Sequence, residues 1–204
     1  EWANIQKPHA TRVLALKETR KLRSCPSLSK RIIRTRWVLT EKEHETGEAT
    51  TAKARLVIQG HNDPDVGEVE CASPTLSREA LPMLLLGIAG CKWTMHIADI
   101  KGAFMNSRAL NRPNGPLYAQ LPHIWPVDGV DPQQLVEVKV AWYGLNDGPI
   151  EFYRTLDEHL LSLGLRKSKL DPCLYRYFNR DGKLAGLAGV TVDDTCYGGD
   201  PEFH

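Results

Sequence analysis

Adjacent carboxylates follow an apolar stretch near the end of the printed sequence, where residues 190–192 lead into Asp193 and Asp194. Two neighbouring carboxylates repel each other unless a cation lies between them or one of them takes up a proton. A hard divalent ion such as Mg²⁺ prefers oxygen ligands and removes that repulsion. Asp is also a favoured turn residue, so the pair by itself is more typical of a solvated turn than of a metal site.

A third carboxylate, Asp99, changes that balance. Residues 93–100 (WTMHIADI) are typical of a β-strand, and a period of two places Asp99 on one face with Ile97. Carboxylates from two neighbouring strands could hold the two metal ions of a phosphoryl-transfer site. Asp99, Asp193 and Asp194 are therefore the candidate catalytic residues and the candidate ligands for Mg²⁺ or Mn²⁺.

The elements that would position these residues alternate without a regular βαβ rhythm, which favours an α+β fold. Runs rich in β-branched and aromatic residues predict strands, with turns between pairs of them at Thr46-Gly47 and Asp181-Gly182. Apolar residues at helical spacing predict the clearest helix over 150–163. The predicted strands are 32–40, 52–59, 93–100, 135–142, 173–178 and 184–192; the other predicted helices are 13–22 and 82–89, with Pro82 in a first turn.

Composition indicates a globular chain, because 42% of the 204 residues are hydrophobic and the formal net charge is only +1. That small net charge hides an asymmetry, since residues 7–36 contain ten basic side chains and one acidic side chain. A basic segment on an otherwise acidic chain suggests nucleic acid as a partner, or else a solvated basic face without a partner. Arg31, Arg34 and Arg36 are the expected contacts.

Several other classes of protein lack support in the sequence. It contains no P-loop, HExxH or GxSxG motif, and its His and Cys residues never stand at zinc-ligand spacing. The five cysteines are an odd, scattered set, which favours a reducing compartment. The longest apolar run, residues 81–91, is too short to span a bilayer, and the first twenty residues hold no signal-peptide core. We therefore expect an intracellular protein, cytoplasmic or nuclear, without membrane association.

A family resemblance rests on four segments in order: KARLVIQG at 53–60, WTMHIADIKGAFMN at 93–106, WYGLNDGP at 142–149 and TVDD at 191–194. They resemble the reverse transcriptases of Ty1/copia-type retrotransposons, in which the corresponding motifs run approximately KARLVAKG, a tryptophan separated by five residues from DVKTAFLN, LYGLKQAP and YVDD. One such motif would be a weak signal. Four in register make it strong, and the resemblance covers residues from about 12 to 204.

The resemblance implies an RNA-directed DNA polymerase that adds deoxynucleotides to a primer 3′ end, with two divalent ions held by the three aspartates. Its partners would be an RNA template, a DNA primer and dNTPs. The implied fold has fingers and a palm, with a small antiparallel palm sheet packed on helices and the thumb absent. The fingers would comprise residues 12–92 and 108–148, the palm residues 93–107 and 149–204, and residues 1–11 would be an N-terminal extension.

The resemblance also implies residues that face the nucleotide. Phe104 matches the bulky gate that excludes a sugar 2′-hydroxyl, although a core phenylalanine would give the same sequence. Lys53 and Arg55 match cations of the fingers that meet the triphosphate, and an exposed strand edge with ordinary surface charges is the alternative. Tyr143 and Gly144 match the segment that lines the nucleotide and the template.

Departures from the family pattern suggest a fragment or a degenerate copy. Thr191 replaces the tyrosine of YVDD, and Asn146-Asp147 replaces Lys-Gln, which puts a carboxylate where a triphosphate is expected to approach. An unpaired Asp147 would repel the nucleotide at a cost of about 1–3 kcal/mol. Since the thumb is also missing, the alternative function is a catalytically inactive retroelement remnant that retains a basic nucleic-acid-binding surface.

Overall fold

The computed structural model describes residues 5, 9–42, 50–124, 127, 129–192 and 194–203. The chain divides into two compact units, one from Glu1–Cys71 and Phe104–Glu151 and the other from Ala72–Ala103 and Phe152–His204. Each unit is built on its own five-stranded sheet, and helices are few among the described residues. The fold is therefore mixed, with two sheets in which antiparallel pairs predominate.

The sheet of the first unit has the strand order β1-β6-β5-β2-β3. Its strands are β1 (Thr11–Val13), β2 (Ile32–Lys42), β3 (Thr51–Ile58), β5 (Leu117–Gln120) and β6 (Leu135–Val138). All neighbours are antiparallel except β2 and β5, which are parallel. The same unit contains helices α2 (Leu16–Ser24) and α3 (Pro26–Ser29) and the 3-10 turn η1 (Gly60–Asn62); the turn η2 (Ala103–Asn106) lies at a boundary between the units.

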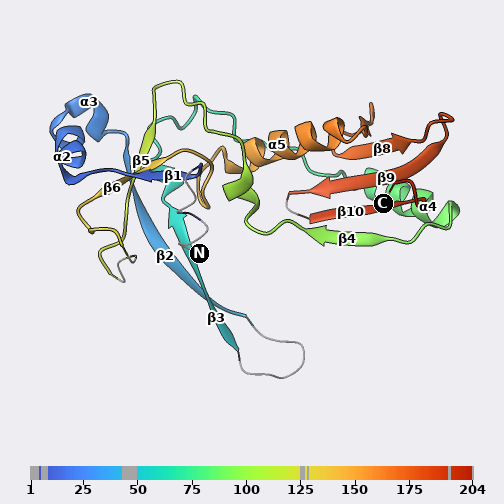
Figure 1. The fold of residues 1–204 in the computed structure, drawn as a ribbon, viewed down its shortest axis with the longest axis horizontal. Helices are drawn as coiled ribbons and strands as arrows, with labels where there is room; N and C mark the ends of the chain where they lie inside the picture. Colours follow the sequence, from blue (N-terminus) through green and yellow to red (C-terminus); the bar gives the residue numbers. More distant parts are fainter. Residues whose placement is uncertain are drawn as a thin grey trace. The chain divides into compact units, whose positions relative to one another are not determined.

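The β2–β3 hairpin, drawn as two long strands in Figure 1, forms where the sequence alternates apolar and basic side chains. In β2, Ile33 and Thr35 are buried whereas Arg34 and Arg36 are exposed. A period of two places these pairs on opposite faces of the strand. Eight residue pairs join β2 to β3, so the predicted pairing of these strands is confirmed. The turn predicted at Thr46-Gly47 lies outside the described residues.

The core of the first unit is centred on Trp142, whose side chain is fully buried. It belongs to a cluster that includes Leu56, Leu117 and Val136 from three strands of the sheet. Ile5 is also buried in this cluster. The strand predicted for 135–142 is shorter in the structure, because β6 ends four residues before Trp142 and the chain then turns toward β3.

The sheet of the second unit has the order β4-β10-β9-β8-β7 and is antiparallel throughout. Its strands are β4 (His96–Asp99), β7 (Arg166–Lys167), β8 (Leu174–Phe178), β9 (Leu184–Thr191) and β10 (Asp194–Gly199). β4 is shorter than the strand predicted for 93–100, and it lies at the edge of the described sheet. Its Ile97 side chain is 71% exposed, so the apolar face predicted for this strand does not enter the core.

Helix α4 (Ala80–Gly90) packs on the second sheet through Leu84 and Ile88, which meet Leu174 and Leu187. Pro82 lies in its first turn, where the missing N–H costs no intrahelical hydrogen bond. Helix α5 (Gly148–Ser162) begins in the first unit and continues in the second. The helices predicted for 82–89 and 150–163 are thus confirmed, with small shifts at their ends.

Asp171 fastens the segment before α4 to the segment before β8. One of its carboxylate oxygens accepts the backbone N–H of Ser77 at 2.9 Å, and the other accepts that of Cys173 at 2.7 Å. Burial alone would raise the pKa of Asp171, but the hydrogen bonds from Ser77 and Cys173 outweigh it and lower the pKa. The carboxylate is therefore held ionised inside the second unit.

No helix in the described part of the chain is both long enough and apolar enough to cross a membrane. The five cysteines are unpaired.

Candidate functional site

Asp99 and Asp194 lie directly opposite each other in the second sheet. Asp99 ends β4, Asp194 begins β10, and the antiparallel register pairs their Cα atoms. Opposite residues of an antiparallel pair point to the same face, with Cβ atoms about 5 Å apart. Both side chains are exposed. Asp193, the third candidate ligand, lies outside the described residues.

Val192, directly after β9, has backbone that bears on the position of Asp194. Thr191 is the last residue of β9 and pairs with Asp194, so only two residues lie between the strands. Val192, the first of them, has a φ of +54°. Left-handed backbone is costly for a β-branched residue and persists only where the surrounding structure imposes it. The strained backbone of Val192 therefore helps to fix the position of Asp194 at the start of β10.

The carboxylate pair has the chemistry of a divalent-cation site. Like charges directly opposite in a sheet destabilise it, and a hard cation between two carboxylates removes that penalty. Within the described residues, no set of three or more His, Cys, Asp or Glu side chains converges. Asp99 and Asp194 thus fit Mg²⁺ or Mn²⁺ in ligand type, as two of the ligands that such an ion needs.

Three of the substrate-binding candidates meet in the first unit. The guanidinium of Arg55, on β3, lies 5.9 Å from the centre of the Tyr143 ring. That ring meets the Phe104 ring edge-to-face at 5.1 Å. Both rings are half-buried, so Phe104 is neither a fully buried core residue nor a free surface residue. The three side chains form a continuous cation–aromatic contact.

Gly144 allows the segment after Trp142 to run against β3. The Ile58 N–H donates to the Tyr143 carbonyl at 2.8 Å. Gly144 has a φ of +89°, and a Cβ added to it would collide with the Ile58 carbonyl oxygen. Gly60 faces the Gly144 carbonyl just as closely. Glycine is therefore required on both sides of this contact, which fixes the position of the neighbouring Tyr143.

Lys53 lies two residues before Arg55 on the same face of β3, directly opposite Thr40 of β2. Its side chain is exposed and forms no ion pair with any described residue. Lys53 and Arg55 thus present two positive charges on one face of the hairpin.

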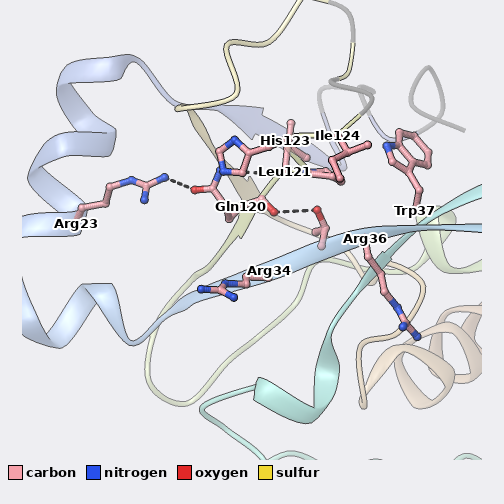
Figure 2. A pocket seen from close by; sticks show the side chains of 10 residues that line it. Arg23, Arg34, Arg36, Trp37, Gln120, Leu121, His123 and Ile124 are labelled. Carbon is pink, nitrogen blue, oxygen red and sulfur yellow. Dashed lines mark hydrogen bonds between the residues drawn. The ribbon is translucent and has the colours of Figure 1, made fainter.

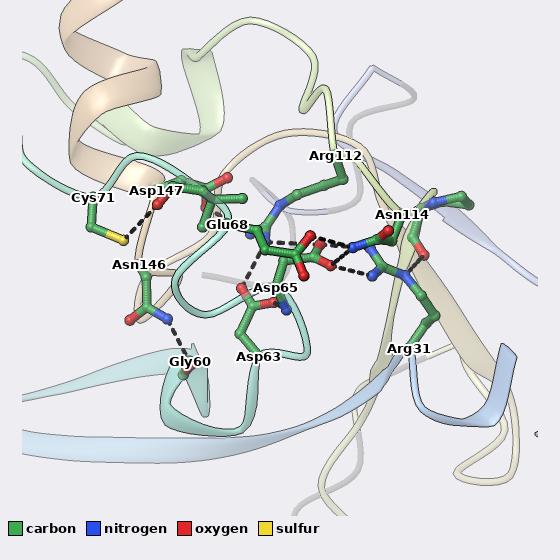
Figure 3. Close-up of polar contacts among 12 residues, drawn as sticks. Arg31, Gly60, Asp63, Asp65, Glu68, Cys71, Arg112, Asn114, Asn146 and Asp147 are labelled. Carbon is green, nitrogen blue, oxygen red and sulfur yellow. Dashed lines mark hydrogen bonds and ion pairs between the residues drawn. The ribbon is translucent and has the colours of Figure 1, made fainter. Parts of the chain in front are cut away.

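A buried ionic cluster lies beside this segment (Figure 3). Arg112 is paired with Asp63 at 2.8 Å and with Asp147 at 2.7 Å, and its side chain is 2% exposed. Arg31 is paired with Asp65 at 2.6 Å. Asp147 is therefore not the unpaired carboxylate whose repulsion the sequence suggested.

The cluster shifts the pKa of its carboxylates in two directions. The hydrogen bond from Arg31 lowers the pKa of Asp65 to about 2, against a smaller opposing effect of burial. Burial raises the pKa of Asp147, and Arg112 offsets only part of that rise. Asn146, the other departure from the family pattern, donates its side-chain amide to the Gly60 carbonyl at 2.7 Å.

The cluster also corrects an expectation about the basic surface. Arg31 is buried and bonded to Asp65, so it is not available to a nucleic-acid partner, whereas Arg34 and Arg36 remain exposed. Apart from the need of Asp147 for a partner, no sequence pattern indicated the cluster. That partner, Arg112, lies 35 residues away along the chain.

Residues 17–201 match the family described as reverse transcriptase (RNA-dependent DNA polymerase). The chain belongs to this reverse transcriptase family. The matched range contains both described aspartates and all five substrate-binding candidates, Lys53, Arg55, Phe104, Tyr143 and Gly144.

Relatives of the reverse transcriptase chain are polyproteins of plant transposons. It is 28% identical over 172 residues to the retrovirus-related Pol polyprotein from transposon RE1 of Arabidopsis thaliana, which covers 83% of this chain and 11% of the relative. The corresponding polyprotein from transposon RE2 of the same plant is 28% identical over 74% of this chain and 10% of the relative. That from transposon TNT 1-94 of Nicotiana tabacum is 25% identical over 72% of this chain and 11% of the relative.

The chain thus spans about a tenth of the length of these Pol polyproteins. The resemblance to the reverse transcriptases of Ty1/copia-type retrotransposons is confirmed at the level of the family.

Proposed function

We propose that this chain is the polymerase part of a retrotransposon Pol polyprotein and acts as an RNA-directed DNA polymerase. The reaction would be the addition of dNTPs to a DNA primer 3′ end on an RNA template. The observation that carries this proposal is the register of the second sheet, which sets Asp99 directly opposite Asp194, close to the strained backbone of Val192. Family membership gives that pair its chemical context.

In this proposal the second unit is the palm and the first unit is the fingers. Residues 72–92, which the family resemblance places in the fingers, then belong to the palm, because α4 packs on the second sheet. The second sheet is small and antiparallel, and α4 packs on β9 and β10. Asp157 of α5 pairs with Lys167 of β7 and accepts a hydrogen bond from the Tyr175 hydroxyl of β8. The N-terminal residues join the fingers through β1, which pairs with β6.

Asp99, Asp193 and Asp194 would hold the divalent ions of the reaction. Bound Mg²⁺ or Mn²⁺ would supply a more acidic primer 3′-hydroxyl and stabilise the negative charge of the triphosphate and of the leaving pyrophosphate. The contribution of the protein is to deliver carboxylates from two adjacent strands and to help fix one of them with the strained backbone of Val192.

Other side chains would bind and orient the nucleotide. Lys53 and Arg55 would neutralise triphosphate oxygens, since both present positive charge on one face of the hairpin. The Arg55–Tyr143–Phe104 contact would hold the Phe104 ring in place, so that its face excludes a sugar 2′-hydroxyl. Gly144 would allow its segment to lie close against Ile58 of β3, which positions the neighbouring Tyr143.

The proposal is tested by primer extension on poly(rA) with an oligo(dT) primer. Asp194→Asn should reduce Mg²⁺-dependent extension at least a hundredfold, which corresponds to about 3 kcal/mol of transition-state stabilisation. Asp181→Asn removes a carboxylate in the exposed β8–β9 turn and is the matched control. Extension that survives Asp194→Asn, or that Asp181→Asn reduces equally, would contradict the proposal.

A separate measurement addresses the metal. Millimolar Mg²⁺ or Mn²⁺ should raise the melting temperature of the parent protein, and Asp194→Asn should abolish that rise. A parent protein that shows neither the shift nor extension, but still binds an RNA–DNA hybrid, would favour the alternative of an inactive retroelement remnant with a basic nucleic-acid-binding surface.

A further inference from the structure

Helix α4 leaves much of its apolar surface uncovered in the second unit. Leu84 and Ile88 pack on the sheet, but Met83 is 53% exposed and Leu86, on the same side of the helix, is 72% exposed. Leu170, between β7 and β8, lines the same pocket as Met83 and is 82% exposed. Exposed apolar side chains that gather in one place indicate an interaction surface, whereas single ones are ordinary.

These side chains border a pocket of about 240 Å³ within the second unit. The exposed Met83 and Leu170 form its rim, and the buried Leu174 of β8 and Leu187 of β9 form its floor. Arg176 of β8 also lines the pocket. Pockets for free small molecules usually exceed roughly 300 Å³, so this one suits a single apolar side chain that belongs to a larger partner. We call this feature, from Met83 to Arg176, the α4–β8 groove.

Two arginines face each other at the β8 side of the groove. The register of β7 and β8 sets Arg166 directly opposite Arg176, and the side chains of opposite residues lie on the same face. Leu187 is the partner of Arg176 on β9, so this face is the one that carries the groove. Both guanidinium groups lie over the Phe178 ring, at 5.3 Å and 5.8 Å from its centre. Two positive charges are therefore held close together.

The protein does not neutralise this arginine pair. Neither Arg166 nor Arg176 forms an ion pair with a carboxylate of the described residues. The Arg176 Nε is buried without a hydrogen-bond partner, and Nη2 donates to the neutral Lys167 carbonyl at 3.4 Å. The carboxylate of Asp171, next to Leu170 in the chain, is already bonded to two backbone amides. Like charges directly opposite each other destabilise a sheet, so a carboxylate supplied from outside would be stabilising here.

The α4–β8 groove differs in composition from the basic cleft of the first unit (Figure 2). That cleft has a volume of about 680 Å³, and Arg23, Arg34 and Arg36 are among its lining residues. In the α4–β8 groove, the described lining side chains are apolar apart from Arg176 and Ser168. A nucleic acid would leave the exposed leucines in water. An acidic amphipathic helix would cover them and also neutralise the arginines.

We propose that the α4–β8 groove binds an acidic amphipathic helix of a partner protein. An apolar side chain of that helix would enter the pocket between Met83 and Leu170, and a carboxylate of the helix would accept hydrogen bonds from Arg166 and Arg176. Apolar anchors at helical spacing, with a charge-assisted pair beside them, are the usual components of such a site. The inference goes beyond the proposed polymerase function, since neither divalent ions nor the aspartates take part in the binding.

The test measures binding of a labelled synthetic peptide by fluorescence anisotropy, without divalent ions. The peptide has leucines at the i, i+3, i+4 and i+7 positions of a helix and glutamates elsewhere, and a second peptide has lysines in place of the glutamates. The parent protein should bind the glutamate peptide, more weakly as salt is raised, and should not bind the lysine peptide. Equal binding of the two peptides, or binding of neither, would overturn the proposal.

Two variants locate the site. Arg176→Gln should weaken binding of the glutamate peptide on the order of tenfold, because it removes a charged donor, whereas Arg180→Gln in the exposed β8–β9 turn should bind as the parent does. Leu170→Asn should weaken binding about fivefold and stay folded, because the Leu170 side chain is exposed. Leu163→Asn changes another exposed leucine of the second unit, outside the groove, and is its matched control.

Melting temperatures establish that each variant is folded, and Leu170→Asn keeps the test decisive if Arg176→Gln unfolds. Unchanged binding in a folded groove variant, or equal losses in its control, would overturn the proposal. Displacement of the glutamate peptide by phosphatidylserine vesicles would assign the groove to a membrane surface, and displacement by an RNA–DNA hybrid would assign it to nucleic acid. A dimer of the parent that Leu170→Asn dissociates would assign the groove to a second copy of the chain. Each of these three results would also overturn the proposal.

The peptide assay and the polymerase assay can fail separately. Asp194→Asn should bind the glutamate peptide as the parent does, because Asp194 does not line the groove. A parent protein that binds the peptide but does not extend a primer would count against the proposed function alone. A parent protein that extends a primer but does not bind the peptide would count against the groove alone.

Discussion

Arg112 is paired with more carboxylates than its single positive charge can neutralise. Its guanidinium and that of Arg31 meet three buried carboxylates, those of Asp63, Asp65 and Asp147. Two positive charges therefore face three carboxylates, so the cluster has a net charge of −1 when all three are ionised. Removing a cation from such a cluster leaves unpaired buried charge, whereas removing a carboxylate brings the charges into balance.

We expect Arg112→Met to lower the free energy of unfolding by about 3–5 kcal/mol, because it strands buried carboxylates. Asp147→Asn should cost about 1 kcal/mol or less, since Arg112 keeps Asp63 and Asp65 as partners. Urea unfolding of the two variants measures the difference. Equal losses would mean that the two residues act only as a pair, and that the charge excess of the cluster has no effect.

Asp171 stabilises the second unit by connecting the segments that precede α4 and β8. Its two oxygens join the segment before α4 to the segment before β8, and the neighbouring Leu76 N–H donates to the Val190 carbonyl of β9 at 3.0 Å. One side chain thus ties together parts of the chain that lie 94 residues apart.

Asp171→Ala should lower the free energy of unfolding by about 2 kcal/mol, because it leaves two backbone N–H groups without their charged acceptor. Hydrogen exchange at the Ser77 and Cys173 amides should accelerate, while amides of the first unit stay protected as in the parent. Asp181→Asn, in an exposed turn, is the matched control. Unchanged exchange at Ser77 would show that other contacts hold the segment.

Elements with strong periodic patterns were predictable from the sequence. The hairpin over 32–40 and 52–59 and the helix over 150–163 agree with β2, β3 and α5 to within a few residues, because alternation and helical spacing are local properties. The sequence allowed part of the Asp99–Asp194 arrangement to be predicted, since each aspartate follows an apolar run. The register that pairs them depends on which strands become neighbours, and no local pattern specifies that choice.

Long-range pairing and exposure were not predictable. Arg112 and Asp63 are 49 residues apart, and their pairing depends on how two irregular loops fold against each other. Ile97 belongs to a run that is typical of a buried strand, yet β4 lies at the sheet edge. Sequence periodicity reports which residues share a face, but not whether another element covers that face.

Both units of the molecule contain a buried carboxylate with a lowered pKa. Asp65 in the first unit has a pKa of about 2, held down by Arg31, and the pKa of Asp171 in the second is lowered by the amides that it accepts. A lowered pKa in the folded state means that the unfolded chain takes up protons first as the pH falls.

We therefore expect stability to be full above the unfolded Asp pKa, about 3.9, and to be lost as the pH falls toward about 2. Asp147 acts in the opposite sense, because its raised pKa gives a contribution that is lost as the pH rises through that value. Urea unfolding of the parent and of Asp171→Asn across the acid range measures the effect. If the variant loses stability with acid as steeply as the parent, Asp171 is not one of the groups responsible.

The edge position of β4 bears on how the protein behaves in concentrated solution. A strand at a sheet edge presents unpaired backbone groups to other molecules, and a charged side chain there discourages strand-to-strand association. Asp99 is that charge, two residues after the exposed Ile97. Asp99→Asn should therefore self-associate at lower concentration than the parent or Asp194→Asn, as light scattering would detect. A loss of activity in Asp99→Asn could then arise from aggregation as well as from the loss of a metal ligand. Asp194→Asn tests the catalytic role without that complication.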